Sequence, residues 1–475
     1  MTSTACVEMV DGVRIVVPDS LNLITSYVLQ EQKDWFEDEI KFLRKLLQPG
    51  QKIIDIGANM GVYALSMART VGPTGRVWAF EPASSTAGLL AQSIAANEFA
   101  HVVLEQCALS SASGTLRLSL NDNSELNELV RDGAPSGASE EVRVSTLDEC
   151  RERHDWRDIA FVKIDAEGEE RNILNGGQRF FAEQSPLVQY EVKAGTTVHL
   201  DLVDHFAALG YHSYRLVPGL GLLVPFERAA RVDTFLLNLF ACKQDRADAL
   251  AAQGFLAQGT FTATQEKRPG ILSAMFGRFT DRGAYDWQSS LVRLPYGKEL
   301  AGSWKLTMIE SDASAEIADA LSQYAMSRET ALTGSQRFAA LSKSLGTFVS
   351  LAKRQPKVTR LASLARAAAD LGERALAVEA LQRLCNEMLE KKKAVDLGEP
   401  FLAPSPRFDS ISPRPSIHDW VIAAGLEELE RFASFSSFYT RETTLPRLNA
   451  IRTLGFASDE MQRRAALIRQ RFATA

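Results

Sequence analysis

The sequence predicts an α/β fold with a largely parallel sheet, followed by an all-α C-terminal region. Between about residues 53 and 242, short β-rich runs alternate with helical patterns, which is typical of a parallel sheet with helices on both faces. From about residue 311 the composition becomes rich in Ala, Leu, Arg and Glu at helical spacing. With 475 residues, 45% of them hydrophobic, the chain is long enough for two or three hydrophobic cores.

The expected strands are bounded by turn residues and rich in β-branched and aromatic side chains. They cover residues 52–57, 75–81, 102–109, 159–165 and 187–192, with 211–217 and 234–242 as a terminal antiparallel pair. We expect a helix over 84–98 with Ser84 as its N-cap. We also expect one amphipathic helix over 29–50 that stops at Pro49-Gly50, within a helical lead-in spanning 20–50. The segment 114–147 interrupts this alternation and predicts a hairpin with a long polar connection, a candidate substrate loop.

These patterns predict three regions, 1–243, 244–310 and 311–475. The middle region has irregularly spaced Gly and Pro and is expected to be an irregular connection. In the last region, residues 361–389 predict two helices separated at Gly372, with the small-residue spacing of a single tetratricopeptide unit. One unit is not an array, and a plain helical bundle is the favoured interpretation. The Pro/Ser-rich stretch 400–416 predicts a break before the last helices.

Composition excludes several classes of protein. Lys and Arg total 53 against 59 Asp and Glu, a net charge of -6, which argues against a nucleic-acid-binding protein. No apolar run reaches the length of a membrane span, and the N-terminus lacks the pattern of a secretory signal. The five cysteines are scattered without metal-ligand spacing. We therefore expect a cytoplasmic protein with reduced thiols.

The sharpest motif is IIDIGANMGVYAL, residues 53–65. A buried strand ends near Asp55, and Gly57, Ala58, Asn59 and Gly61 turn the chain into a helix. Glycine allows a tight turn and the close approach of a ligand.

One strand later, GRVWAFEP places Glu81 and Pro82 at the same edge of the sheet, where an acid can accept both hydroxyls of a ribose. The spacings GxGxxG and GK[ST] are absent, which disfavours dinucleotide and P-loop sites. An ordinary strand-to-helix turn is the alternative interpretation.

The stretches DIGANMGVYAL, VWAFEP, EQCALSSASGTLRL and FVKIDAEGEERNIL with QYEV together resemble the FkbM family of methyltransferases over roughly residues 50–195. The resemblance implies a Rossmann-like class I methyltransferase sheet. It implies S-adenosylmethionine as cofactor and S-adenosylhomocysteine as product. The cofactor-binding residues it implies are Asp55, Gly57, Ala58, Asn59, Gly61, Glu81, Pro82, Cys107, Ala108 and Asp165. For Cys107, a plain buried thiol is at least as well supported.

The acids of the stretch KIDAEGEE, residues 163–170, have different expected roles that depend on their positions. Asp165 closes a strand at the same sheet edge, and Glu167 follows in the turn. With Glu191 at the end of the next strand, they are the candidate catalytic bases. Glu169 and Glu170 open a helix, where negative charge is favourable.

Further side chains near this stretch have weaker assignments. Lys163 lies on the same side of its strand as Asp165 and is expected either to neutralise part of the cluster or to pack against the sheet. His199 is a second candidate base, with a surface histidine as the favoured interpretation. A divalent metal on Asp165 and Glu191 is possible but not favoured.

The resemblance implies an oxygen acceptor, and we expect O-methylation of a hydroxyl on a glycan or secondary metabolite. Three alternatives stay open: a protein methyltransferase that recruits its target through the helical region, a degenerate fold acting as a binding module, and another nucleotide enzyme such as a dehydrogenase. The helical region is expected to bind the acceptor, a partner protein or a second copy of the chain.

Overall fold

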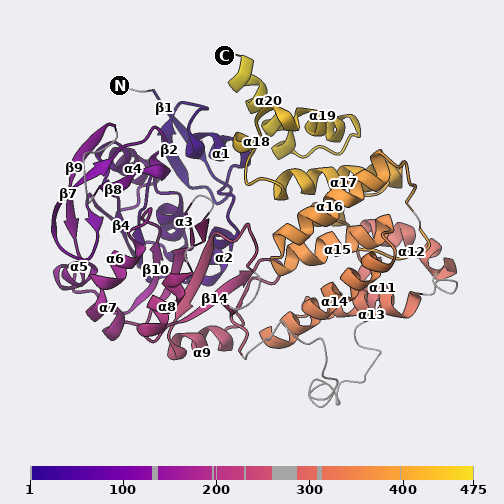
Figure 1. Ribbon diagram of the computed structural model, residues 1–475, viewed down its shortest axis with the longest axis horizontal. Helices are drawn as coiled ribbons and strands as arrows, with labels where there is room; N and C mark the ends of the chain where they lie inside the picture. The colour runs from indigo at the N-terminus through magenta and orange to yellow at the C-terminus, as the bar shows by residue number, and fades with distance from the viewer. Residues whose placement is uncertain are drawn as a thin grey trace.

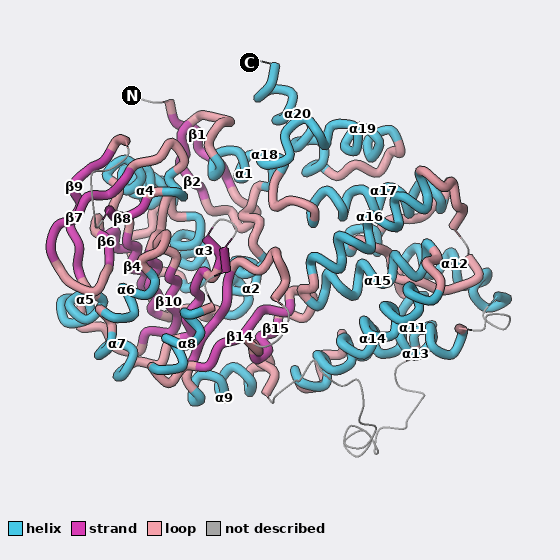
Figure 2. The backbone as a smooth tube through the Cα atoms, viewed as in Figure 1, coloured by secondary structure: helices cyan, strands magenta, loops and turns pink. Residues whose placement is uncertain are grey.

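A computed structural model describes residues 3–130, 137–194, 197–198, 200–228, 232–258, 286–307, 313–395 and 397–473. The α/β part lies beside a layer of helices that runs to the C-terminus (Figure 1). The strands gather in the N-terminal half, whereas the C-terminal half is drawn as helices and loops (Figure 2). This is the predicted fold class, an α/β sheet followed by an all-α region.

The main sheet has eight strands in the order β15-β14-β16-β11-β10-β3-β4-β5. The strands from β11 to β5 are parallel, while β16 runs antiparallel to both β11 and β14. The bounds are β3 Lys52–Ile56, β4 Arg76–Phe80, β5 Val102–Glu105, β10 Ile159–Ile164, β11 Leu187–Glu191, β14 His212–Val217, β15 Leu222–Pro225 and β16 Asn238–Cys242. The predicted terminal pair is confirmed as β14 and β16.

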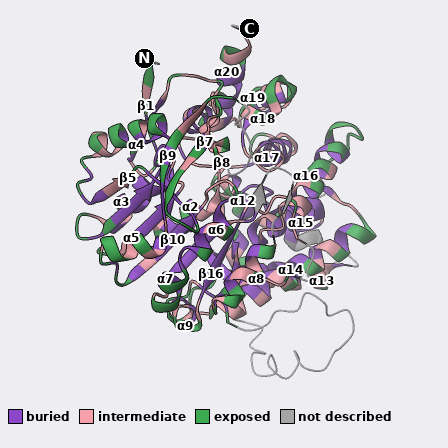
Figure 3. Ribbon diagram, turned by 60° about the vertical axis from the view of Figure 1, so that its left-hand side comes forward, coloured by how far each residue is buried: buried purple, intermediate pink, exposed green. Residues whose placement is uncertain are grey.

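Helices cover both faces of this sheet because successive strand residues point to opposite sides. Ile53 packs in one core with α2, α3, α4 and α9, and Ile54 packs in the other with α5 to α8. The strands at the centre of the sheet are buried on both faces (Figure 3). These helices are α2 Asp38–Leu46, α3 Val62–Val71, α4 Ser84–Asn97, α5 Leu147–Arg153, α6 Glu170–Asn175, α7 Gln178–Glu183, α8 Asp201–Ala208 and α9 Gln244–Ala252.

A small second sheet, ordered β6-β9-β7-β8, extends from the edge of the main sheet. Its antiparallel β7 and β9 confirm the predicted hairpin within 114–147, and a short 3-10 turn, η1, precedes β8. The bounds are β6 Ala108–Leu109, β7 Gly114–Ser119, η1 Ser124–Leu126, β8 Glu128–Val130 and β9 Ser139–Ser145. Two further two-stranded sheets are β1 Thr4–Glu8 with β2 Arg14–Pro18, and β12 Lys193–Ala194 with β13 Thr197–Val198.

The C-terminal region is helical as predicted. Gly372 adopts a left-handed conformation (φ 84°) and ends α15, so α15 and α16 form the expected helix pair. The bounds are α11 Trp287–Val292, α12 Pro295–Thr307, α13 Ser314–Ser327, α14 Gly334–Arg354, α15 Val358–Leu371, α16 Arg374–Leu389, η2 Pro406–Ser410, α17 Ile417–Phe432, α18 Ser437–Thr440, η3 Arg441–Thr444, α19 Leu445–Thr453 and α20 Asp459–Ala473.

The single N-terminal helix predicted over 29–50 is wrong. The chain forms α1, Ile24–Gln32, and then α2, which ends at Leu46. Lys33 is left-handed (φ 58°) and stops α1, and Asp38 and Glu39 supply the acidic first turn of α2. Because the helix is interrupted, the connecting residues 33–37 can reach the pocket described below.

Three further predictions need correction. The strand over 102–109 divides into β5 and β6 because the chain turns at Cys107, whose N–H donates to the Glu105 carbonyl. Ser84 is the first residue of α4 and not its N-cap, since its side chain and N–H bind Glu140. The region 244–310 contains α9, α11 and α12, while its residues 259–285 lie outside the described part of the chain.

The core of the helical region includes side chains from the main sheet. Val217, Leu222 and Val224 of β14 and β15 pack in the same cluster as Leu361 and Trp420. Gly219 N–H also donates to the Asp370 carbonyl at 2.9 Å. The two regions therefore share one hydrophobic core. Within the described residues, no helix combines the length and apolarity that a bilayer crossing requires.

Candidate functional site

The carboxyl ends of β3, β4 and β10 form the floor of a pocket of about 1020 Å³, a volume that includes its open mouth. The strand order reverses between β3 and β10, and ligands of parallel α/β sheets bind at this switch point. Most of the predicted cofactor residues line the pocket: Asp55, Gly57, Ala58, Asn59, Glu81, Pro82, Cys107, Ala108 and Asp165. The sequence therefore predicted the position of the pocket.

The glycines of the turn have packing roles. Gly57 is left-handed (φ 80°), and a Cβ there would lie 1.7 Å from the backbone oxygen of Asp165. The absent side chain thus allows the ends of β3 and β10 to meet. Gly61 (φ 94°) lies outside the pocket lining, and its Cβ would meet Leu90 at 2.4 Å. The expected contact of Gly61 with the cofactor stays a prediction. In the structure, the missing side chain of Gly61 allows the turn to pack against α4.

Asp55 is fully buried, and neither of its carboxylate oxygens has a hydrogen-bond partner of normal geometry among the described residues. Burial raises the pKa of Asp55 to about 6, while the nearby Lys163 ammonium opposes the rise. An unpartnered buried carboxylate is costly unless a ligand satisfies it. Asp55 therefore marks a place where a hydrogen-bond donor or a cation belongs.

Glu81 lies on the other side of the turn and organises it. Its Oε2 accepts from the Asn59 N–H at 2.9 Å and its Oε1 from the Ala83 N–H at 3.0 Å. Burial raises the pKa of Glu81 to about 7, against the lowering effect of these two N–H groups. Each carboxylate oxygen keeps a further lone pair for a ligand hydroxyl. The geometry is compatible with the predicted contact to a ribose.

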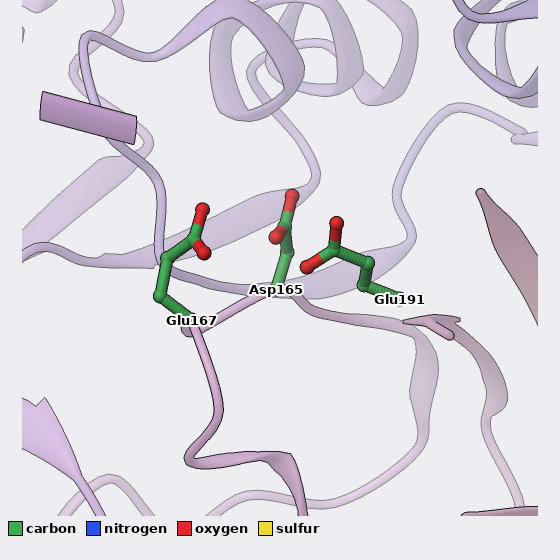
Figure 4. Close-up of side chains that lie close together, drawn as sticks. All are labelled: Asp165, Glu167 and Glu191. Carbon is green, nitrogen blue, oxygen red and sulfur yellow. The ribbon is translucent and has the colours of Figure 1, made fainter. Parts of the chain in front are cut away.

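Three carboxylates come together at the ends of β10 and β11. Asp165, Glu167 and Glu191 each offer an oxygen, and these atoms lie within 4.8 Å of one another. Figure 4 shows Asp165 between the other two. Glu191 is not among the residues that line the pocket. It is next to the site because its carboxylate lies close to those of Asp165 and Glu167. The sequence thus predicted which acids would be neighbours across two strands.

The members of this trio differ in electrostatics. Asp165 accepts from the Lys163 ammonium at 2.6 Å, which confirms the predicted neutralisation. Burial, with the charges of Asp165 and Glu170 adding, raises the pKa of Glu167 to about 8. Burial and the charges of Asp165 and Glu167 raise the pKa of Glu191 to about 10. Burial and the neighbouring charges therefore favour the protonated form of Glu191, and they bring the pKa of Glu167 closer to neutral pH.

Glu167 has a strained backbone (φ 46°) at the tip of the turn after β10. The turn is fixed by Glu170, which accepts from the Ala166 N–H at 3.0 Å and the Gly168 N–H at 3.3 Å. Glu169 accepts from the Ser110 hydroxyl at 2.7 Å. Glu169 and Glu170 begin α6 as predicted, and both are buried. The Glu170 carboxylate holds the turn that carries Glu167, while the Glu169 carboxylate binds Ser110 and Asn172.

Sequence reasoning missed the wall that comes from the break between α1 and α2. Trp35 and Glu37 line the pocket there. Glu37 accepts from the Tyr63 hydroxyl at 2.6 Å, from Asn238 at 3.0 Å and from the Trp35 indole at 3.1 Å. Lys163 lies 4.7 Å from the centre of the Tyr63 ring. Because we predicted one continuous helix, we did not expect this part of the pocket wall. The acid close to Trp35 in the sequence could have indicated a site there.

The predicted substrate loop reaches the pocket. Ser124, Glu125 and Asn127 line it, and the Ser124 hydroxyl donates to Asn59 Oδ1 at 2.9 Å. The Thr25 N–H donates to Glu125 at 3.2 Å, which ties the loop to α1. The loop thus spans from the turn at Asn59 to the start of α1. The second candidate base, His199, lies outside the described residues.

The sheet order, with its antiparallel strand β16 next to the last parallel strand, and the acid-lined pocket at the switch point define the class I methyltransferase fold. Residues 55–213 match the family model of the methyltransferase FkbM domain. This part of the chain is therefore similar to the methyltransferase FkbM domain.

Solved structures similar to the chain include three methyltransferases. The FkbM methyltransferase from Methylobacillus flagellatus is 18% identical, with a TM-score of 0.29, over 42% of this chain and 45% of that one. The match thus spans less than half of that protein. A SAM-dependent O-methyltransferase from Thermotoga maritima is 15% identical (TM-score 0.26; 48% and 72% covered). A SAM-dependent methyltransferase from Aquifex aeolicus is 12% identical (TM-score 0.25; 45% and 90% covered). No curated protein matches the chain.

Proposed function

We propose that the chain transfers a methyl group from S-adenosylmethionine to a hydroxyl of a glycan or secondary metabolite. The observation that carries the proposal is the buried carboxylate of Asp55, which has no hydrogen-bond partner of normal geometry among the described residues. It lines a pocket at the switch point of a sheet that matches the FkbM domain. When bound, S-adenosylmethionine supplies an activated methyl group on a positively charged sulfonium.

The residues present fit such a cofactor. Of the described residues that line the pocket, seven are acids and one, Lys163, is a base. This excess of negative charge favours a cationic ligand and disfavours a phosphate-bearing one. A ribose fits Glu81, whose carboxylate oxygens have spare lone pairs. The seven acids are Glu37, Asp55, Glu81, Glu125, Asp165, Glu167 and Glu169.

A hydroxyl acceptor needs a base, and the acidic trio provides one. Glu167 is our first candidate, because its pKa of about 8 lies close to working pH and its side chain lines the pocket. Asp165, held by Lys163, orients the acceptor or serves as the base itself. In its protonated form, which burial and the neighbouring charges favour, Glu191 can donate a hydrogen bond to the other two carboxylates.

We propose that this reaction needs no metal. The trio has the spacing of a divalent-cation site, but the Lys163 ammonium already contacts Asp165 and neutralises part of the cluster. Exclusion of water and alignment of the acceptor are then the main contributions of the pocket to the rate.

The test uses S-adenosylmethionine that carries tritium in its methyl group. The purified protein and this donor are incubated with an extract of the organism whose genome encodes the chain, and the labelled products are separated by class. We expect label in saccharide or small-molecule fractions, stable to mild base as an ether is. Label in polypeptide would instead support a protein methyltransferase. Absence of transfer, with S-adenosylhomocysteine still bound, would support a binding module and contradict the proposal.

A further inference from the structure

Lys163 is a buried lysine whose ammonium lies among the carboxylates of the pocket. It is 4% exposed, lines the pocket, and donates from Nζ to Asp165 Oδ2 at 2.6 Å. Burial lowers the pKa of Lys163, but neighbouring carboxylates raise it above its usual value. These carboxylates belong to Asp165, Asp55 and Glu37. Lys163 therefore carries a positive charge that three separate parts of the chain surround with negative charge.

Lys163 also lies at the centre of a row of polar residues that crosses three strands. In the register of the sheet it pairs with Asp55 of β3 on one side and with Gln189 of β11 on the other. Such neighbours project to the same face of a sheet. The Asp55 carboxylate oxygens and Gln189 Oε1 are buried and have no hydrogen-bond partner of normal geometry among the described residues. The ammonium is thus flanked by acceptors that suit a cation.

The ring of Tyr63 on α3 fixes the position of this ammonium. Lys163 Nζ lies 4.7 Å from the centre of the ring, at which distance a cation is attracted to an aromatic face. The Tyr63 hydroxyl donates to Glu37 at 2.6 Å and accepts from Gln189 at 3.5 Å. Because Tyr63 is itself held at its hydroxyl, the ammonium has a rigid support on the side of α3.

The acidic trio meets this ammonium through Asp165. The Asp165 side chain keeps 31% of its surface exposed, while that of Lys163 behind it keeps 5%. Asp165 also lies between Glu167 and Glu191, with oxygens of all three within 4.8 Å of one another (Figure 4). Three carboxylates at this spacing suit a divalent cation, but a fixed positive charge beside the shared member repels one.

We infer that Lys163 is the resident cation of the acidic trio: it aims the Asp165 carboxylate at the acceptor and keeps a divalent metal out. The inference rests on the proposed function and deepens it, since it says how the trio works without metal. Lys163 acts through Asp165 and is therefore a positioning residue. Removal of its charge should misalign Asp165 and, at the same time, open the trio to a metal ion.

The test compares the variants Lys163→Met, Lys163→Arg and Lys52→Met with the parent. Methionine keeps the length of the side chain without its charge, whereas arginine keeps the charge. Lys52 is the matched control because it begins β3, at the end of the sheet away from the pocket, and donates to the Arg157 carbonyl at 3.1 Å. Each full-length variant is titrated by calorimetry with Mn²⁺ and with S-adenosylhomocysteine. Each is also assayed for tritium transfer to serial dilutions of the extract fraction that the parent labels.

We expect Lys163→Met to bind Mn²⁺ at least about tenfold more tightly than the parent, because the repelling charge is gone. Its kcat should fall about 10- to 100-fold, the cost of a misplaced reacting group, with the apparent KM and the affinity for S-adenosylhomocysteine changed less than about twofold. Lys163→Arg should exclude Mn²⁺ as the parent does and recover most of the lost kcat. Lys52→Met should match the parent throughout.

A double variant separates positioning from a merely structural role. If Lys163 acts through Asp165, Lys163→Met should lower kcat no further in a chain that already carries Asp165→Asn, and this chain should gain no Mn²⁺ affinity. The comparison also holds where Lys163→Met alone does not fold, because the double variant leaves neither charge unpaired. A further fall of tenfold in the double variant would overturn the positioning role.

The two readouts distinguish this inference from the proposed function. Equal Mn²⁺ affinity of the parent and Lys163→Met would overturn the role of Lys163 as resident cation. An unchanged kcat in Lys163→Met, with active parent protein, would overturn its positioning role and leave the proposed function intact. A parent protein that transfers no methyl group to any fraction would overturn the proposed function and the positioning role that rests on it, while Mn²⁺ binding would still decide whether Lys163 excludes metal from the trio.

Discussion

Glu81 lines the pocket and binds the turn after β3 through the Asn59 N–H. Because its carboxylate is ionised above a pKa of about 7, it is a charged acceptor for ligand hydroxyls at slightly alkaline pH. The Glu81→Ala variant should bind S-adenosylhomocysteine about 10- to 150-fold more weakly, the equivalent of about 1.5–3 kcal/mol for hydrogen bonds to a charged group. Calorimetry at pH 8 measures the change. Glu128→Ala, in an exposed residue of β8, is the control, and equal affinity of both variants would remove Glu81 from the site.

As the proposed base, Glu167 should make methyl transfer depend on pH. A base works only when ionised, and a carboxyl group with a pKa of about 8 becomes ionised as the pH rises through 8. We therefore expect kcat to rise between about pH 7 and 9. Glu167→Gln should lower kcat about 100-fold or more and abolish this rise.

Asp165→Asn separates the alternatives for the base. If Glu167 is the base, the Asp165 variant keeps a rise of kcat with pH, displaced to lower pH because the charge that raises the Glu167 pKa is gone. A variant of Glu167 with the parental pH profile would assign the base to Asp165 or Glu191 instead.

At the scale of the element, the meeting of β3 and β10 depends on Gly57. Its left-handed backbone and the backbone oxygen of Asp165, 1.7 Å from the position of a Cβ, both exclude a side chain. Gly57→Ala should lower the free energy of unfolding by about 3 kcal/mol or more, since backbone must move to relieve the clash. Urea denaturation measures this.

Gly88→Ala is the matched control for this change. Gly88 lies in α4 with open space around its Cβ position, so alanine there should leave stability equal or raise it by up to about 1 kcal/mol. Equal stability of the two variants would show that β3 and β10 can separate without cost.

The elements differ in how far the sequence predicted them. The strands of the sheet and the turn from Asp55 to Gly61 carry local signals, a buried β-rich run followed by glycines, and were predicted to within a few residues. The break between α1 and α2 was missed because the apolar spacing continues across Lys33, whose left-handed backbone is set by tertiary packing. The pocket wall with Trp35 and Glu37 was missed with it.

Contacts between distant parts of the chain had no sequence signal. Arg464 of α20 is 1% exposed and lies 3.4 Å from Glu31 of α1, with Glu430 and Glu460 beside it. In the sequence, each of these residues is a charged side chain of the kind expected on the surface of a helix. Only the folded chain brings them together in a buried cluster.

At the scale of the molecule, the two regions share a hydrophobic core and this buried ionic network. Val217 and Leu222 of the sheet pack among the helices, and Glu31 binds α18 and α20. We therefore expect one cooperative thermal transition for the full chain in differential scanning calorimetry. Two resolved transitions would show that the helical region is an independent module.

The central claim is that the pocket at the ends of β3, β4 and β10 binds S-adenosylmethionine. Titration of the full chain with S-adenosylhomocysteine in a calorimeter tests it most directly, with NAD as the comparison ligand. We predict saturable one-to-one binding of S-adenosylhomocysteine that Glu81→Ala weakens, and no heat from NAD. Binding of NAD alone, or no binding of S-adenosylhomocysteine, would contradict the account.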